Sequence, residues 1–314
     1  MSAYADPRPG RSQSLGQVGR AILPLYLARR LPLVAAVACY FDESFDVEVH
    51  VVAGYVALVE TWDESFAPEW NEEIGKATKR IREFKAGDCR QGNGEFKNWT
   101  RAERDRLTRS LVNVICHNRI LAGFAAAVVF PGIGRSRKDR AAVEQIAYGI
   151  GIGMCFCRCL SVLTKIGAEL DRSGLRVRIG QDEIQLFMDH REGFYKRALS
   201  NFEFAKKYVG EHLCASIPPP APGNSLKTPA LQAADLLAYE VRKEVRNRMQ
   251  RRGVSVALER LLSAHPHVSV CLHGPDLEEY NRSAKANEVP RFHEKRLLGT
   301  HVARPPGSWL VPPE

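Results

Sequence analysis

The chain has 314 residues, of which 45% are hydrophobic and 26% charged, and its formal net charge is +9. This composition is typical of a folded globular protein and excludes a fully disordered or fibrous chain. Five Arg residues and one Asp lie within the first 30 residues, so about half of the positive excess belongs to that segment. The remaining charge is compatible with nucleic acid as a partner, and equally with a mildly basic soluble protein.

The chain contains eight cysteines but no Cys-x-x-Cys pair. Cys155, Cys157 and Cys159 are spaced two apart in a segment that we expect to be helical. Residues at this spacing point to different sides of a helix, so these thiols cannot converge on one zinc ion. The pattern predicts free thiols and a reducing compartment, the cytoplasm.

The N-terminal segment, residues 1–30, is rich in Gly, Pro, Ser and Arg and is expected to be a disordered leader, or the result of a start codon assigned too early. Arg29-Arg30 and the apolar residues up to Cys39 resemble a twin-arginine export signal. We favour a core strand here, because β-forming residues continue directly into Tyr40-Phe41-Asp42. No segment is expected to reach the ~18 apolar residues needed to span a bilayer, and we expect no membrane partner.

The first half of the chain predicts a hairpin, a helical cover and a third strand. Apolar strands are expected over 33–41 and 48–59, joined by the polar residues 42–47. Trp62, Phe66 and Trp70 recur at helical spacing and predict an aromatic face that packs on the sheet. The remaining expectations are an extended segment over 81–86, a Gly-rich loop over 87–98, a helix to Asn118 that begins with the capping box Thr100 and Glu103, and a strand over 120–130.

The second half begins with a turn over 131–138 and a helix to about Leu170 that is apolar nearly all round and must be buried. A strand over 184–188 ends at Asp189. The elements expected after it are a helix to Lys207, a short strand over 213–217, a proline-rich loop over 218–223, a helix over 229–252, and one further helix before a Pro-rich tail. We therefore predict an α/β fold with a mixed sheet, in a domain over 31–252 followed by a C-terminal segment over 253–314.

Three acidic residues lie at the ends of the predicted buried elements. Asp42 and Asp189 end strands, and Asp235 lies near the start of the late helix. Carboxylate oxygens are preferred ligands of Mg²⁺ and Mn²⁺, and such ions activate water and stabilise a phosphodiester leaving group. Glu43 joins Asp42 in this site only if the strand turns between them, because successive strand residues face opposite sides. A salt bridge or a turn is the structural alternative for each acid taken alone.

Several other residues are candidates for the same site. Gln232 shares a helix face with Asp235 and is expected to orient a water or a carboxylate. Lys85 is a candidate phosphate contact, with a solvated loop as its alternative. Basic residues follow Asp235 on the same helix and are candidates for contacts with a nucleic-acid backbone, or simply favour the end of a helix dipole; those that we assign are Arg242, Lys243 and Arg246.

Short motifs follow one another over about residues 37–245: Tyr40-Phe41-Asp42-Glu43-Ser44, Ala53-Gly54-Tyr55-Val56-Ala57, Glu83-Phe84-Lys85-Ala86, Glu95-Phe96 with Trp99, and Leu231 to Tyr239. Through these motifs the sequence resembles the uncharacterised family named domain of unknown function 3800. The resemblance implies a ribonuclease H-like fold with extra helices inserted and an enzyme whose site includes Asp42, Glu43, Gln232 and Asp235. It also implies that Asp189 is the fourth-strand acid. Phe45 stands where the family has a glycine, which removes a flexible position after Ser44.

Two functions remain open at this level. The first is a nuclease or phosphodiesterase that depends on Mg²⁺ or Mn²⁺ and acts on nucleic acid, with Asp42, Asp189 and Asp235 as metal ligands. The second is a catalytically inactive module of the same fold that binds nucleic acid or protein and uses these acids for structure. A role in mobile elements or phage defence rests on the family resemblance alone.

Overall fold

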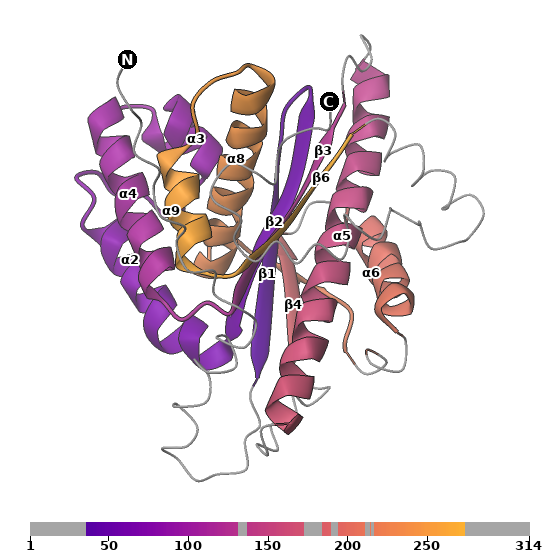
Figure 1. Ribbon diagram of the computed structural model, residues 1–314. Coiled ribbons are helices and arrows are strands. Elements are labelled where there is room, and N and C mark those ends of the chain that lie inside the picture. Colours follow the sequence, from indigo (N-terminus) through magenta and orange to yellow (C-terminus); the bar gives the residue numbers. More distant parts are fainter. Residues whose placement is uncertain are drawn as a thin grey trace, which may run out of the picture.

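In the computed structural model, a six-stranded mixed sheet lies between two layers of helices, so the predicted α/β class is confirmed (Figure 1). The structure describes residues 36–130, 137–172, 184–189, 194–210, 214 and 217–273. The expected leader over 1–30, the Pro-rich tail and most of the turn expected over 131–138 lie outside the described residues, and the last two residues of that turn belong to the helix α5.

The sheet has the strand order β5-β4-β1-β2-β3-β6. The central strand β1 pairs antiparallel with β2 and parallel with β4, and β2 pairs antiparallel with β3. The outer strands β5 and β6 run parallel to β4 and β3. The bounds are β1 Val37–Phe45, β2 Val49–Leu58, β3 Ala122–Val129, β4 Ile184–Asp189, β5 Ala221–Gly223 and β6 His267–Leu272.

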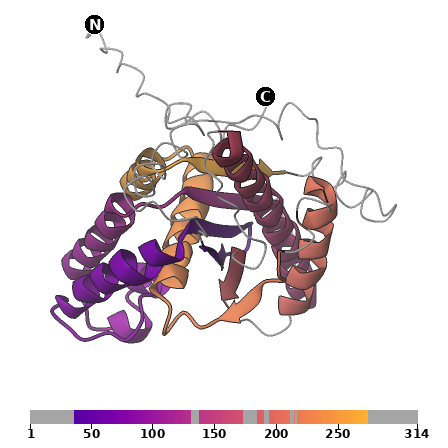
Figure 2. The same ribbon diagram turned by 90° about the horizontal axis from the view of Figure 1, so that it is seen from below.

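One face of the sheet is covered by α5 (Arg137–Arg172), with α6 (Tyr195–Val209) packed against it (Figures 1 and 2). Contrary to the expectation from sequence, one stretch of α5, Val143–Lys165, is long and apolar enough to cross a membrane by length and composition. In its most apolar window 83% of the residues are buried inside the protein, as in the core helix of a soluble protein. The apolar surface of α5 is therefore accounted for by the sheet and α6.

The other face is covered by α8 (Pro229–Met249), which contacts β1 and β2. Around α8 lie η1 (Thr61–Phe66), α2 (Ala67–Gly75), α4 (Arg101–His117) and α9 (Val256–Ala264) (Figure 2). Trp62, Phe66 and Trp70 are buried in this layer, as their spacing predicted. The predicted capping box is also present, since Thr100 accepts a hydrogen bond from the Glu103 N–H and Glu103 accepts one from the Thr100 N–H.

The connection between β1 and β2 is shorter than predicted. β1 continues through Glu43 to Phe45, and the turn is formed by Asp46, whose carboxylate accepts hydrogen bonds from the N–H groups of Glu48 and Val49 at 2.9 and 3.0 Å. The polar residues after Phe41 had suggested a loop, but pairing with β2 keeps them in the strand. Asp42 and Glu43 therefore face opposite sides of the sheet.

The segment predicted as a Gly-rich loop over 87–98 is partly helical. It contains α3 (Ala86–Gln91) and the short η2 (Gly94–Phe96). Gly92 ends α3 with φ 74°, a left-handed conformation that favours glycine. Gly92 thus ends a helix instead of forming part of an open loop.

The C-terminal part also differs from prediction. The strand expected over 213–217 falls mostly outside the described residues, and Cys214 within it is helical. The Pro-rich run, predicted as a loop, contains β5, a short edge strand, where proline is tolerated. The strand β6 was not predicted, and through β3 it attaches residues beyond 252 to the sheet.

Candidate carboxylate site

Asp42 and Asp189 lie on neighbouring parallel strands. The last paired residues of β1 and β4 are Phe41 and Met188, and Asp42 and Asp189 each follow directly. Side-chain alternation directs both carboxylates to the face covered by α8, because Phe41 and Met188 pack in the core on the α5 side. The carboxyl ends of parallel strands meet at one edge of a sheet, so these two acids come together as the sequence predicted.

Helix α8 brings the third acid to this face. Pro229 lies in its first turn, where a missing N–H costs nothing, and a buried apolar stripe fixes the helix against β1 and β2. Asp235 is 9% exposed and Asp42 is 6% exposed. Two carboxylates separated by 193 positions in sequence are thus held in the protein interior on one side of the sheet.

The segment 83–86 is anchored to the N-terminal half of α8 by hydrogen bonds from its backbone N–H groups to two α8 side chains. Asp235 Oδ2 accepts a hydrogen bond from the Ala86 N–H at 2.6 Å, and Gln232 Oε1 accepts one from the Phe84 N–H at 3.1 Å. These two contacts flank Lys85. They therefore fix the backbone from which the Lys85 side chain extends toward the carboxylates.

The Lys85 ammonium group lies among the acids. Its Nζ atom is 3.5 Å from Asp189 Oδ2 and 3.2 Å from Glu83 Oε1, and it donates a hydrogen bond to Ser225 Oγ at 3.0 Å. Burial lowers the pKa of Lys85, but the surrounding carboxylates outweigh this effect and raise it above the usual value, with Asp42 contributing most. Lys85 is thus held in its charged form inside the site.

Burial and mutual repulsion raise the pKa values of two carboxylates in this site, Asp42 and Asp235. Burial raises the pKa of Asp42 well above its ordinary value, and the negative charge of Asp235 raises it further. Glu43 and Asp189 add to this rise, whereas Lys85 lowers the pKa. Burial also raises the pKa of Asp235, to about 6, against the opposing effects of the Ala86 N–H and Lys85. Clusters of buried carboxylates with raised pKa values are a feature of catalytic and ion-binding sites, although structural networks produce them too.

Glu43 lies away from these acids. The strand is regular at this position, with Glu43 opposite Val52 in β2. Its side chain therefore faces α5, where its charge acts together with burial to raise the pKa of Tyr148. Asp42 and Glu43 could serve one site only if the backbone turned between them, and it does not.

Gln232 holds three segments together. Its Oε1 atom accepts hydrogen bonds from Trp70 Nε1 at 2.9 Å and from the Phe84 N–H, and its Nε2 atom donates to the Ser225 carbonyl at 2.7 Å. The sequence suggested that it orients a water or a carboxylate. The structure gives it an indirect role, because it positions the segments that carry Lys85 and Ser225.

The basic residues further along α8 are largely neutralised by acids. Arg242 and Arg246 contact Asp46 Oδ2 at 3.2 and 3.1 Å, and Lys243 contacts Glu240 at 3.0 Å. The first two fasten α8 to the β1–β2 turn. Their assignment as nucleic-acid contacts stays a prediction, and their ion pairs provide a structural reason for the basic pattern.

The donor set suits a hard divalent cation, because three carboxylates from β1, β4 and α8 face the same space. Within the described ranges, however, no group of three or more His, Cys, Asp or Glu side chains is arranged to hold a metal ion. The ammonium group of Lys85 provides the positive charge instead. The chemistry of the donors fits Mg²⁺ or Mn²⁺, while their spacing does not form a closed ligand cage.

Two residues of the site were not assigned from the sequence. Glu83 pairs with Lys85 and adds negative charge near Asp235, and Ser225 accepts the Lys85 hydrogen bond. Glu83 belongs to one of the motifs that carry the family resemblance, which is a signal that could have identified it. Ser225 has no comparable signal, because it reaches the site through a loop before α8.

Comparison of the chain with protein-family models, with curated proteins and with solved structures gave no match.

Proposed function

We propose that this protein is a divalent-metal-dependent hydrolase that cleaves phosphodiester bonds in nucleic acid. The observation that carries the proposal is the convergence of Asp42, Asp189 and Asp235 on one face of the sheet, around the charged Lys85. Burying several carboxylates together destabilises a fold, so a chain that does so has a reason beyond stability.

Asp42, Asp189 and Asp235 would hold Mg²⁺ or Mn²⁺, which in such a site supplies an activated water and stabilises the developing charge on phosphate oxygens. Lys85 is placed to contact a phosphate oxygen, since it is one-third exposed while held by Ser225 and Asp189. Asp235 keeps its orientation through the Ala86 N–H. Gln232 fixes the segment that carries Lys85.

The strand order supports a ribonuclease H-like interpretation. The central strand β1 lies between β4, which is parallel to it, and β2, which is antiparallel, and acids occupy β1 and β4 as the family resemblance implies. Membership in domain of unknown function 3800 is part of the same proposal. We also place the protein in the cytoplasm, because all eight cysteines are free thiols.

A catalytically inactive binding module is the second candidate. The observation in its favour is that each of two acids has a structural partner, since Asp189 pairs with Lys85 and Asp235 accepts the Ala86 N–H. In this case the carboxylates fasten the segment Glu83–Ala86 to the sheet, and the fold binds nucleic acid or protein without cleaving it.

The test compares the protein with its Asp42→Asn and Glu43→Gln variants on single- and double-stranded DNA, RNA and RNA/DNA hybrids. Each reaction contains Mg²⁺, Mn²⁺ or EDTA. Glu43→Gln is a matched control, because it removes the neighbouring charge on the opposite face of the sheet. We expect cleavage by the wild type and Glu43→Gln that is lost in EDTA and in Asp42→Asn.

A folded wild-type protein that cleaves none of these substrates with either metal would contradict the hydrolase proposal. If it nevertheless binds one of them, and Asp42→Asn binds equally well, the inactive module is the better description. Cleavage that survives in Asp42→Asn would assign the activity to another site or to a contaminant.

A further inference from the structure

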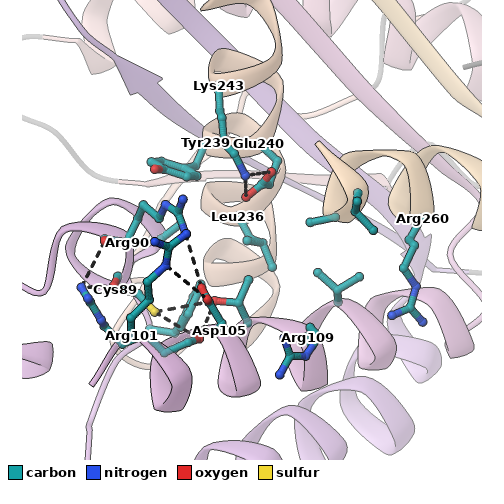
Figure 3. A pocket seen from close by; sticks show the side chains of 17 residues that line it. Cys89, Arg90, Arg101, Asp105, Arg109, Leu236, Tyr239, Glu240, Lys243 and Arg260 are labelled. Carbon is teal, nitrogen blue, oxygen red and sulfur yellow. Dashed lines mark hydrogen bonds and ion pairs between the residues drawn. The ribbon is translucent and has the colours of Figure 1, made fainter. Parts of the chain in front are cut away.

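A second site lies between α3, α4, α8 and α9, on the side of α8 away from the sheet. It is a pocket of about 450 Å³ (Figure 3). Its apolar floor includes Phe84, Val112 and Leu236, and Tyr239 lies at its wall. This volume is in the range of small-molecule sites.

The rim of the pocket is strongly basic. Six of the lining residues are basic and two are acidic, Asp105 and Glu240. The basic residues come from all four helices or the segments that adjoin them: Arg90, Arg101, Arg104, Arg109, Lys243 and Arg260. An apolar floor with a rim of net positive charge favours a ligand that combines an apolar ring with negative charge.

The acidic residues neutralise only part of this charge. Asp105 is shared by Arg90 and Arg101 at 3.4 and 3.6 Å, and Glu240 pairs with Lys243 (Figure 3). Among the described residues Arg109 forms no ion pair or hydrogen bond. An exposed guanidinium group at the mouth of a pocket is available to a ligand.

Arg260 is similar, because its guanidinium group contacts the neutral Asn113 Oδ1 at 2.6 Å and has no acidic partner in the described part of the chain. Arg104 is held by the carbonyl oxygens of Cys89 and Arg90, at 3.0 and 3.1 Å. Its Nε atom is buried and has no hydrogen-bond partner within the described residues. A buried donor without a partner carries an energetic cost.

We propose that this pocket binds a nucleoside phosphate. Five of the six basic residues are arginines, whose planar guanidinium groups match phosphate oxygens in pairs. The apolar floor and Tyr239 provide the surface on which a planar base packs. The ligand is either a free nucleotide or the phosphorylated end of a nucleic acid, since both present the same group.

The pocket adjoins the carboxylate site without sharing its acids. Phe84 and Ala86 line the pocket, and the residue between them, Lys85, extends to the carboxylates. Leu236 lines the pocket directly after Asp235. The same short segments thus form a wall of both sites, yet binding in the pocket does not depend on catalysis by Asp42.

The test is calorimetric titration of the full-length protein with AMP, ATP, UMP, ribose 5-phosphate and inorganic phosphate. A short oligonucleotide with and without a 5′-phosphate distinguishes the two sources of the ligand. We expect a nucleoside phosphate to bind more tightly than inorganic phosphate or ribose 5-phosphate. Arg109→Gln and Arg260→Gln should each weaken binding about tenfold, as expected for loss of a charge-assisted hydrogen bond.

Arg106→Gln is the matched control, because Arg106 is exposed on the same helix as Arg109 but does not line the pocket. It should leave the affinity unchanged, as should Asp42→Asn, which separates this proposal from the hydrolase. Binding by free nucleotides or only by the 5′-phosphorylated oligonucleotide supports the proposal and names the source. No binding by folded wild-type protein, equal binding of inorganic phosphate, or equal affinity in the Arg109, Arg260 and Arg106 variants would overturn it.

Discussion

Asp42 shows how one buried carboxylate carries an energetic cost. It is 6% exposed, its Oδ1 atom accepts a hydrogen bond from the Glu43 N–H at 2.7 Å, and its pKa is raised by burial and by the acids nearby. Ionising this side chain in the folded protein is therefore less favourable than in water. At neutral pH the folded protein therefore either holds a buried negative charge on Asp42 or keeps Asp42 protonated at a pH where it would ionise in water.

We expect Asp42→Asn to stabilise the protein at neutral pH while it abolishes cleavage. The amide keeps an oxygen for the Glu43 N–H but carries no charge near Asp235, so the free energy of unfolding should rise by about 1–2 kcal/mol. Urea denaturation at pH 7 in EDTA measures this change. Glu64→Gln, an exposed change on η1, should have almost no effect. A destabilised Asp42→Asn variant would mean that the carboxylate is structural.

Asp235 predicts a pH dependence of stability. Its pKa in the folded protein is about 6, above its ordinary value of 3.8, because burial favours the protonated form. This group therefore contributes stability below pH ~4, and that contribution is lost as the pH rises through about 6. Relative to wild type, Asp235→Asn should gain stability across this interval and remain constant above pH 7. Unfolding free energies measured between pH 4 and 8 in EDTA test this, and a pH-independent difference between the two proteins would refute it.

At the scale of elements, the site depends on a segment without regular structure. Residues 81–85 form neither helix nor strand, yet they carry Glu83 and Lys85 to the carboxylates. Gln232 on α8 keeps this segment in place through hydrogen bonds to the Phe84 N–H, the Trp70 indole and the Ser225 carbonyl. One helix residue therefore joins α2, α8 and two loops.

We expect Gln232→Ala to destabilise the protein by about 2–4 kcal/mol, because two buried donors and one carbonyl lose their partners. The variant should also expose the Trp70 ring to solvent, which shifts its fluorescence to longer wavelength. Gln91→Ala, an exposed change in α3, is the control and should leave both quantities nearly unchanged. A Gln232→Ala variant that is as stable as wild type, but inactive, would instead support the direct role that the sequence suggested.

At the scale of the whole molecule, residues beyond 252 add an edge strand to the sheet and a helix to one of its layers. Strand β6 pairs with β3 from Gly123 to Val128, and Leu258 and Leu261 of α9 are buried on the α8 face. Residues beyond 252 therefore complete both the sheet and one helical layer. Without them, β3 would present an unpaired apolar edge.

A chain that ends at residue 252 should consequently aggregate or lose its cooperative unfolding transition, because it exposes the edge of β3 and the apolar surface under α9. Size-exclusion chromatography and thermal unfolding followed by circular dichroism measure this. A second chain that ends at residue 273 separates the contribution of 253–273 from that of later residues. If the chain ending at 252 is monomeric and as stable as the full-length protein, α9 and β6 are dispensable.

The sequence was sufficient for elements whose pattern is local. The aromatic spacing of Trp62, Phe66 and Trp70, the capping box at Thr100 and the apolar α5 each predict a correct element, since helix periodicity and capping involve residues only a few positions apart. The placement of acids directly after the paired stretches of β1 and β4 was also readable, because each apolar run there changes to polar residues.

Other elements were decided by contacts between distant residues. Asp42 and Glu43 read as a loop but continue β1 because β2 supplies their partners, and β6 exists because β3 offers an edge. The short strand β5, which contains Pro222, forms beside β4 for the same reason. A strand owes its stability to a neighbour that its own sequence does not specify, so such segments escape prediction from local pattern.

The sequence by itself determined which acids are candidates, which helices carry apolar faces, and which apolar runs form the central strands. Only the tertiary structure decided that Asp42 faces α8 while Glu43 faces α5, that Lys85 lies among the carboxylates, and that Arg242 and Arg246 pair with Asp46. It also assembled the arginine-rimmed pocket from four helices. The reason is physical: composition and periodicity depend on neighbours along the chain, whereas the charge around a site depends on residues that meet only after folding.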